Sequence, residues 1–328
     1  RVGHRLHVGG GQFAPLQPVA RVGEFSLHGG RQPERHLHHD LPGRHCGHLD
    51  RRGSGTAWRP QAGWDRRSSN ARDAQDLACF KTINGTLTID SSSEETKLTA
   101  IDLPRLEVVA GSVLVENNSS LKSLKMPSLK WIDGILSRVS VQNNPELTLI
   151  DLHSFNTPVD LLIGTHNELI TIDLASLETV SDIVIWSDSL QHLDLSSLRE
   201  VLSNVEFSVA APLVLPRLEI VDFLGIAGGK TPKLELPALI ELNMASIFNN
   251  EELMTIDMPS LTTVHRIMDI HDNPALTNMS MPALINCSFI FKIKNNASLC
   301  ASVVDSVLDQ WRDDELCILD IAGNRSGC

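Results

Sequence analysis

The sequence of 328 residues contains no run of about 18 apolar residues, so it lacks a stretch that would cross a membrane as a helix. It begins at Arg1 without a positively charged and then apolar leader, and no signal peptide is visible. It also lacks a P-loop, a glycine-rich dinucleotide fingerprint and a nucleophile elbow. We therefore predict a non-enzymatic chain with no transmembrane segment, no catalytic residues and no cofactor.

Lysine and isoleucine are both absent from residues 1–76, although the rest of the chain is rich in them. This segment holds 12 Arg and 7 acidic residues, a formal charge of +5, whereas the remainder holds 16 basic and 33 acidic residues, a charge of −17. Its many Gly, Pro and His residues show no hydrophobic periodicity, so it cannot bury enough apolar surface to fold. We predict that residues 1–76 are disordered, or spurious sequence from a misread frame, and that the folded domain spans 77–328.

The same segment shows no convincing nucleic-acid or metal site. Its arginines are diluted by acidic residues and are not interleaved with aromatic residues, so we predict no nucleic-acid partner. Its histidines lack the tight spacing of metal ligands, and we predict no metal site. The residues concerned are His36, His38, His39, His45, Cys46 and His48.

A short repeat organises the rest of the chain. The outline of Leu103-Pro104-Arg105-Leu106, a leucine or methionine followed by a small residue or proline, returns at steps of 20 to 26 residues. Such a period indicates a solenoid, in which each turn stacks on the last and its strands pair in parallel. We predict about nine turns, roughly 40 Å in length at about 4.8 Å per turn. The leucines, isoleucines and valines should fill the interior, and proline should lie at a corner.

A second, alternating strand follows each copy of this outline and often ends in asparagine. Ser112-Val113-Leu114-Val115-Glu116-Asn117-Asn118 is an example. Asparagine at one position of successive turns should form a column whose side-chain amides satisfy backbone groups. The predicted members are Asn118, Asn144, Asn167, Asn250, Asn273 and Asn296.

The last part of the chain differs from the repeat. Residues 299–311 place apolar side chains at helical spacing, which predicts a short amphipathic helix that caps the open end of the stack. Three of the six cysteines, Cys300, Cys317 and Cys328, lie in the last 29 residues. We expect Cys300 to bond to Cys317 or to Cys328, which favours an oxidising compartment.

These features resemble the receptor L-domain family of insulin-receptor and epidermal-growth-factor-receptor ectodomains, and related fungal cell-wall proteins. The resemblance rests on Cys79 before the first strand, the repeated leucine outline, the turns at 143–147 and 272–276, and the ending 295–300. It implies an all-β, right-handed parallel β-helix, a leucine-rich solenoid, over residues 78–328. It also implies a secreted or cell-surface location, with which seven N-x-S/T sequons are compatible.

An acidic column is expected on one surface of the stack. Asp151, Asp173 and Asp194 occupy the same repeat position in three adjacent turns, where like charges repel unless a cation or salt screens them. We interpret them as a solvated acidic stripe; a weak divalent-cation or basic-partner site is the alternative.

Outward positions of the second strand vary from turn to turn, and variation on a regular frame is how solenoids build binding surfaces. Leu162, Trp186, Phe248 and His271 are the binding candidates, because exposed apolar and aromatic groups often mark contact sites. A register shifted by one residue would instead place Trp186 in the core.

The sequence therefore predicts an extracellular or cell-surface module that recognises a protein or a glycan through the sheet face of the solenoid. A structural protein of a cell wall or matrix, without a specific ligand, is the alternative. A β-helix enzyme acting on carbohydrates is disfavoured, because no carboxylates with a basic partner cluster locally.

Overall fold

The computed structural model describes residues 66–68, 77–92, 98–134, 136–164, 166, 168–287, 289–308, 317–326 and 328. All of them lie in one compact unit, Gly55–Cys328. The segment 1–76 lies outside these residues apart from 66–68, so its predicted disorder and the boundary at residue 77 stay predictions. No helix among the described residues is long and apolar enough to span a membrane.

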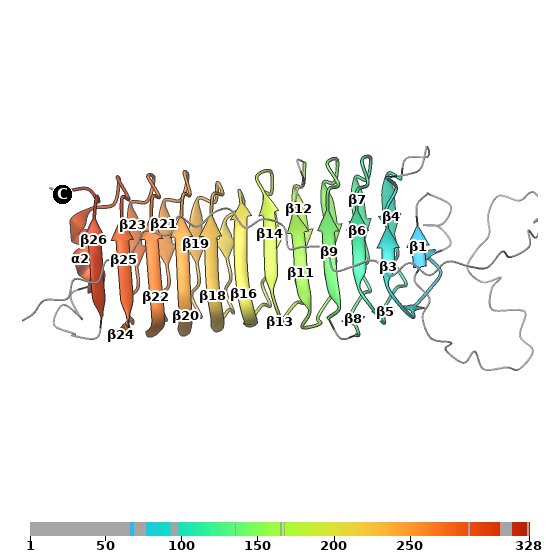
Figure 1. Ribbon diagram of the computed structural model, residues 1–328, viewed down its shortest axis with the longest axis horizontal. Coiled ribbons are helices and arrows are strands. Elements are labelled where there is room, and N and C mark those ends of the chain that lie inside the picture. Colours follow the sequence, from blue (N-terminus) through green and yellow to red (C-terminus); the bar gives the residue numbers. More distant parts are fainter. Residues whose placement is uncertain are drawn as a thin grey trace, which may run out of the picture. The chain divides into compact units, whose positions relative to one another are not determined.

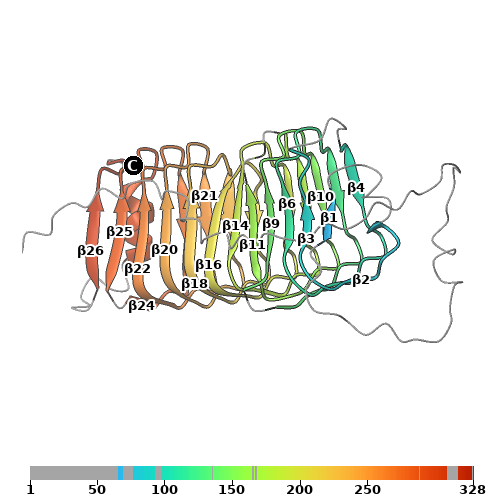
Figure 2. The same cartoon turned by 45° about the vertical axis from the view of Figure 1, so that its right-hand side comes forward.

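The described residues form a parallel β-solenoid of about nine turns, as predicted. Figure 1 shows the strands of its largest sheet, sheet A, side by side along the stack, and Figure 2 shows successive turns lying over one another. Sheet A has 14 strands, of which twelve pair in the order β1-β3-β6-β9-β11-β14-β16-β18-β20-β22-β25-β26. Their bounds are Arg66–Ser68, Leu87–Ile89, Val113–Glu116, Arg138–Gln142, Asp160–Gly164, Ile183–Ser187, Glu200–Val209, Ile220–Ala227, Glu241–Phe248, Thr263–His271, Ile290–Lys294 and Ile318–Ala322. The short strands β13 (Thr179–Val180) and β24 (Asn286–Cys287) pair with β16 and β22.

Three smaller sheets complete the turns. Sheet B contains β2 (Thr82–Ile83), β5 (Val108–Val109) and β8 (Trp131–Ile132). Sheet C contains β4 (Ala100–Asp102), β7 (Ser123–Lys125), β10 (Leu149–Asp151), β12 (Thr171–Asp173) and β15 (His192–Asp194). Sheet D contains β17 (Leu213–Val214), β19 (Lys233–Glu235), β21 (Thr255–Asp257) and β23 (Asn278–Ser280).

The interior is filled by the repeated apolar positions. Alternate residues of each sheet A strand point inward, such as Val139 and Val141 of β9, and both are buried. The leucine or methionine that begins each repeat outline is also buried. These residues are Leu103, Met126, Leu152, Leu174, Leu195, Leu215, Leu236, Met258 and Met281. The prediction that the outline forms the lining is therefore correct.

A buried asparagine ladder joins successive turns at the end of sheet A. Asn273 is fully buried, and its Nδ2 donates to the carbonyl oxygens of Ile247 at 2.9 Å and His271 at 3.1 Å. Its own Oδ1 accepts from the backbone N–H and from Nδ2 of Asn250, at 3.1 and 3.0 Å. The same pattern links Asn118 to Asn144, and Asn296 to Asn324.

The residue before each ladder asparagine explains why asparagine pairs recur in the sequence. Asn117, Asn143, Asn249, Asp272 and Asn295 all have φ between 54° and 61°, the left-handed region. Asn, Asp and Gly are the residues that tolerate this conformation best. The first residue of each pair therefore turns the chain, and the second enters the core.

One member of the predicted column, Asn167, lies outside the described residues. In its turn the buried His166 makes a contact of the ladder type. The His166 Nε2 lies 3.0 Å from the carbonyl oxygen of Val141. In the preceding turn, Asn144 Nδ2 makes the equivalent contact with the carbonyl oxygen of Val115. The Nδ1 lies 3.2 Å from the carbonyl oxygen of Asn144. Burial lowers the pKa of His166, although both backbone contacts oppose this.

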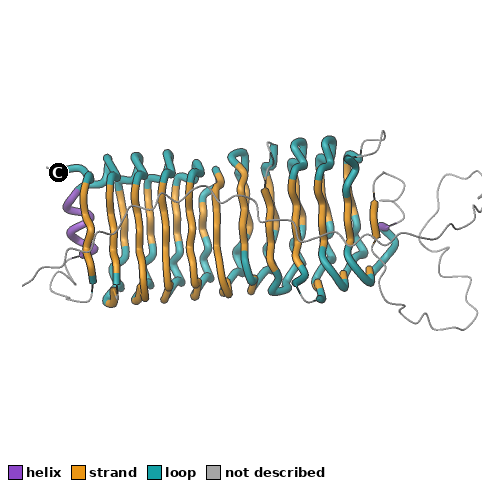
Figure 3. Tube along the Cα trace, viewed as in Figure 1, coloured by secondary structure: helices purple, strands orange, loops and turns teal. Residues whose placement is uncertain are grey.

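The C-terminal end carries the predicted short helix, α2 (Ala301–Leu308), whose Val304, Val307 and Leu308 are buried. Figure 3 shows it beside the last strands of the stack. A disulfide joins Cys300 to Cys328, which decides between the two predicted partners of Cys300. Cys317 and Cys79 are also disulfide-bonded. The last predicted residue of the helix, Trp311, lies outside the described residues.

We expect Asn273→Ala to lower the free energy of unfolding by about 3 kcal/mol, because it leaves buried carbonyl and N–H groups without partners. Urea denaturation of the full chain measures this change. Asn278→Ala, at an exposed position of β23, is the matched control and should change stability by less than about 0.5 kcal/mol. Equal effects of the two substitutions would contradict the role of the ladder.

We expect His166 to make the fold sensitive to acid. Its pKa in the folded chain is lowered from about 6.5, so the unfolded state binds the proton more readily, and stability is lost as pH falls below about 6.5. His166→Asn should weaken this pH dependence, because asparagine is the residue of the neighbouring ladder positions. Urea denaturation at pH 8 and at pH 5 tests this. His192→Asn, at an exposed site, should leave the dependence unchanged.

Candidate binding face

The outer face of sheet A carries three rows of outward side chains, because pairing in register brings equivalent residues of neighbouring strands together. The start row contains Arg138, Asp160, Asp182, Asn204, Phe223, Met244, Ile267, Ile290 and Ile318. The central row contains Leu114, Ser140, Leu162, Val184, Glu206, Gly225, Ser246, Asp269, Lys292 and Asp320. The end row contains Glu116, Gln142, Gly164, Trp186, Ser208, Ala227, Phe248, His271, Lys294 and Ala322.

Trp186 points outward from β14, and 46% of its surface is exposed. The register that places Trp186 in the core is therefore wrong. The indole leans over Gly164 of β11, where an added Cβ would lie 3.5 Å from the Trp186 Cε3 atom. Ser208 is its partner on the other side. The ring thus lies between two small residues, with a large part of its surface open to solvent.

Acidic and amide groups lie at the other end of the same strands. Asn204 donates to the Asp182 Oδ1 from its backbone N–H at 2.9 Å and from Nδ2 at 2.7 Å. Burial raises the pKa of Asp160, and the charge and hydrogen bond of Asp182 raise it further, whereas Arg138 acts in the opposite direction. Leu162 and Val184 are register partners between these groups and Trp186, and both are half-buried.

The part of the face formed by β18 to β26 has a different character. Its start row is an unbroken apolar row of Phe223, Met244, Ile267, Ile290 and Ile318. In the end row of the same part of the face, Phe248 and His271 stack with ring centroids 5.2 Å apart. The His271 Nδ1 lies 2.9 Å from Asp272 Oδ2, and this hydrogen bond lowers the pKa of Asp272.

The four binding candidates named from the sequence thus all lie on the outer face of sheet A, but as two groups. Leu162 and Trp186 are on the adjacent strands β11 and β14, and Phe248 and His271 are on β20 and β22, beyond β16 and β18. Asp160, Asp182 and the apolar row were not predicted from the sequence. Apolar and outward residues alternate in 160–164 and 183–187. This alternation would have placed both aspartates at the start of a strand, with their side chains on the outer face.

The predicted acidic column lies elsewhere, on sheet C. Asp151 pairs with Asp173, and Asp173 with Asp194, in adjacent strands β10, β12 and β15. Each carboxylate accepts the backbone N–H of the residue two positions later, at 3.3 Å from His153, 3.1 Å from Ala175 and 3.0 Å from Ser196. The three carboxylates therefore stabilise the corners of their own turns.

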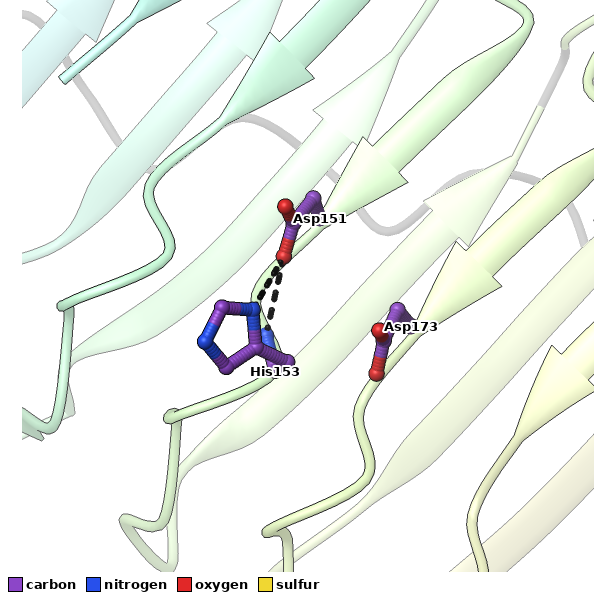
Figure 4. Close-up of side chains that lie close together, drawn as sticks. All are labelled: Asp151, His153 and Asp173. Carbon is purple, nitrogen blue, oxygen red and sulfur yellow. Dashed lines mark hydrogen bonds and ion pairs between the residues drawn. The ribbon is translucent and has the colours of Figure 1, made fainter. Parts of the chain in front are cut away.

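A possible metal-ligand group occurs in this column. One ligand atom each from Asp151, His153 and Asp173 lies within 4.8 Å of the others, and in the described part of the chain no other such group of three occurs. Figure 4 shows the His153 ring turned toward the Asp151 carboxylate, whose Oδ1 lies 2.8 Å from Nδ1. The three side chains are partly or fully exposed, and the two aspartates already bond backbone groups, which favours a solvated corner.

A comparison with protein-family models agrees with the resemblance found in the sequence. Residues 61–158 match the receptor L domain family. A leucine-rich repeat protein from Bacteroides ovatus, known from its crystal structure, is similar at 11% sequence identity, over 73% of this chain and 91% of that protein, with a TM-score of 0.16. The search of curated proteins found no match.

We expect Asp173→Asn to leave stability unchanged or slightly higher, because the amide oxygen still accepts from Ala175 and one like charge is removed. Asp173→Ala should cost about 1 kcal/mol, because that acceptor is lost. Urea denaturation in the presence of a chelator measures both. A rise in melting temperature on adding Ca²⁺ or Zn²⁺ that Asp173→Asn abolishes would instead show that the column holds an ion.

Proposed function

We propose that residues 77–328 form an extracellular or cell-surface binding module that contacts a protein or a glycan through the outer face of sheet A. The observation that carries this proposal is the half-exposed Trp186 on a rigid parallel sheet. An exposed aromatic side chain on a fixed frame buries a large area on binding and loses little conformational entropy.

Three further observations support the proposal. The core positions repeat from turn to turn while the outward positions differ, as in other solenoid binding surfaces. Residues 61–158 match a family of binding domains. The Cys300–Cys328 disulfide suits an oxidising, extracellular environment. We also propose that the chain is not an enzyme, because the carboxylates found together, at Asp160 with Asp182 and in the acidic column, lie on open sheet faces rather than in a groove.

A structural role in a wall or matrix is the second candidate. It is favoured by sequon asparagines at exposed positions, Asn84, Asn117, Asn278 and Asn286, where glycans would cover the stack. Asn118 and Asn296 are also sequons, but they are fully buried in the ladder. We expect them to carry no glycan.

Binding of the full chain to an array of glycans and ectodomain proteins tests the proposed face. Trp186→Ala or Phe248→Ala should lower the affinity for a partner selected from the array at least tenfold, as expected of an aromatic hot spot. Trp131→Ala is the matched control, because Trp131 is 50% exposed but belongs to β8 of sheet B. Binding that survives both face substitutions, or that Trp131→Ala weakens equally, would contradict the proposal.

A further inference from the structure

The region around Trp186 has the shape of a platform rather than of a hydrophobic patch. The neighbours of Trp186 in the end row are small or polar, namely Gly164, Ser208 and, one strand further on either side, Gln142 and Ala227. A protein hot spot is usually ringed by other packed side chains that exclude water. An indole with small neighbours in its own row, and with Leu162 and Val184 in the row beside it, suits a flat ligand with one apolar face and a polar edge, such as a pyranose ring.

Fixed polar groups lie farther along the same outer face. The Asp182 carboxylate is held by two hydrogen bonds from Asn204, and the Glu116 carboxylate accepts from Ser140 Oγ at 2.8 Å. Asp182 lies four residues before Trp186, about 13 Å along the strand. Carboxylates and amides in fixed positions accept and donate pairs of hydrogen bonds, which matches the neighbouring hydroxyl groups of a sugar chain.

The charge of this region selects among glycans. Between β6 and β16, the three rows hold four carboxylates, Glu116, Asp160, Asp182 and Glu206, and one basic side chain, Arg138. Residues 77–328 as a whole carry a formal charge of −17. An acidic polysaccharide would be repelled, whereas a neutral one would meet no electrostatic penalty.

We infer that the outer face of the sheet A strands β9, β11, β14 and β16 is a site for a neutral oligosaccharide, which stacks on Trp186 and hydrogen-bonds to Asp182 and Asn204. This inference rests on the proposed binding role of sheet A and specifies its ligand class. A protein partner would instead favour the apolar row from Phe223 to Ile318 on the other part of the face, where five apolar side chains lie side by side.

Titration of the full chain with soluble hexasaccharides tests the inference. The neutral probes are cellohexaose, laminarihexaose, chitohexaose and mannohexaose, and hexagalacturonic acid is the acidic control. We expect at least one neutral probe to bind, with a loss of at least tenfold in Trp186→Ala and a smaller loss in Asn204→Ala. Trp131→Ala should bind as the unchanged chain does, and equal melting temperatures show that the variants are folded.

Two results would overturn the inference. The first is that none of the four neutral probes binds at millimolar concentration; the second is that hexagalacturonic acid binds more tightly than all of them. A third case separates the two proposals: no neutral probe binds, but a protein from the array does, and its binding is abolished by Met244→Asp and kept in Trp186→Ala. The glycan site then fails, and the proposed binding face stands. If no partner depends on sheet A at all, both fail.

Discussion

Hydrogen bonds between one turn and the next hold this molecule together, because a single turn is too short to bury its own apolar face. The backbone pairs along sheets A to D provide most of them, and the asparagine ladder adds a buried side-chain link at the end of sheet A. Asn273, for example, donates from Nδ2 to the Ile247 carbonyl of the preceding turn, and its backbone N–H donates to the Oδ1 of Asn296 in the following turn. A turn that slipped by one residue would lose these bonds and expose its leucines.

The rest of the structure follows from this fixed register. It places every inward residue of sheet A above its equivalent in the turn before, and it also aligns the outward residues that no core requirement constrains. Asp182 and Trp186 belong to one repeat and Asn204 to the next, and Asn204 joins them on one face only because β14 and β16 pair in register. The same rule places Asp151 beside Asp173 on sheet C, where the carboxylates serve the corners of the turns.

Much of the frame could be predicted from the sequence, because each of its positions recurs about nine times. The leucine lining, the asparagine column and the family resemblance rest on repetition, whereas the capping helix was predicted from apolar residues at helical spacing. His166 was missed because a single histidine in place of asparagine has no repeat to reveal it. The apolar row from Phe223 to Ile318 was missed because interior and exterior isoleucines look alike in a sequence. The extra residues in β16 and β22 also interrupt the alternation there. Asp160 and Asp182 lie 22 residues apart, and only the stacked turns bring them together.

The central claim is that the turns stack in this register, with β11 and β14 presenting one outer face. Paired cysteines in the full chain test it most directly. Oxidation of the double variant Leu162→Cys with Val184→Cys should form a disulfide, found by peptide mass mapping, because these outward residues are register partners. The pair Leu162→Cys with Trp186→Cys, which is offset by two residues, should not. Cross-linking of the offset pair in preference to the register pair would contradict the account.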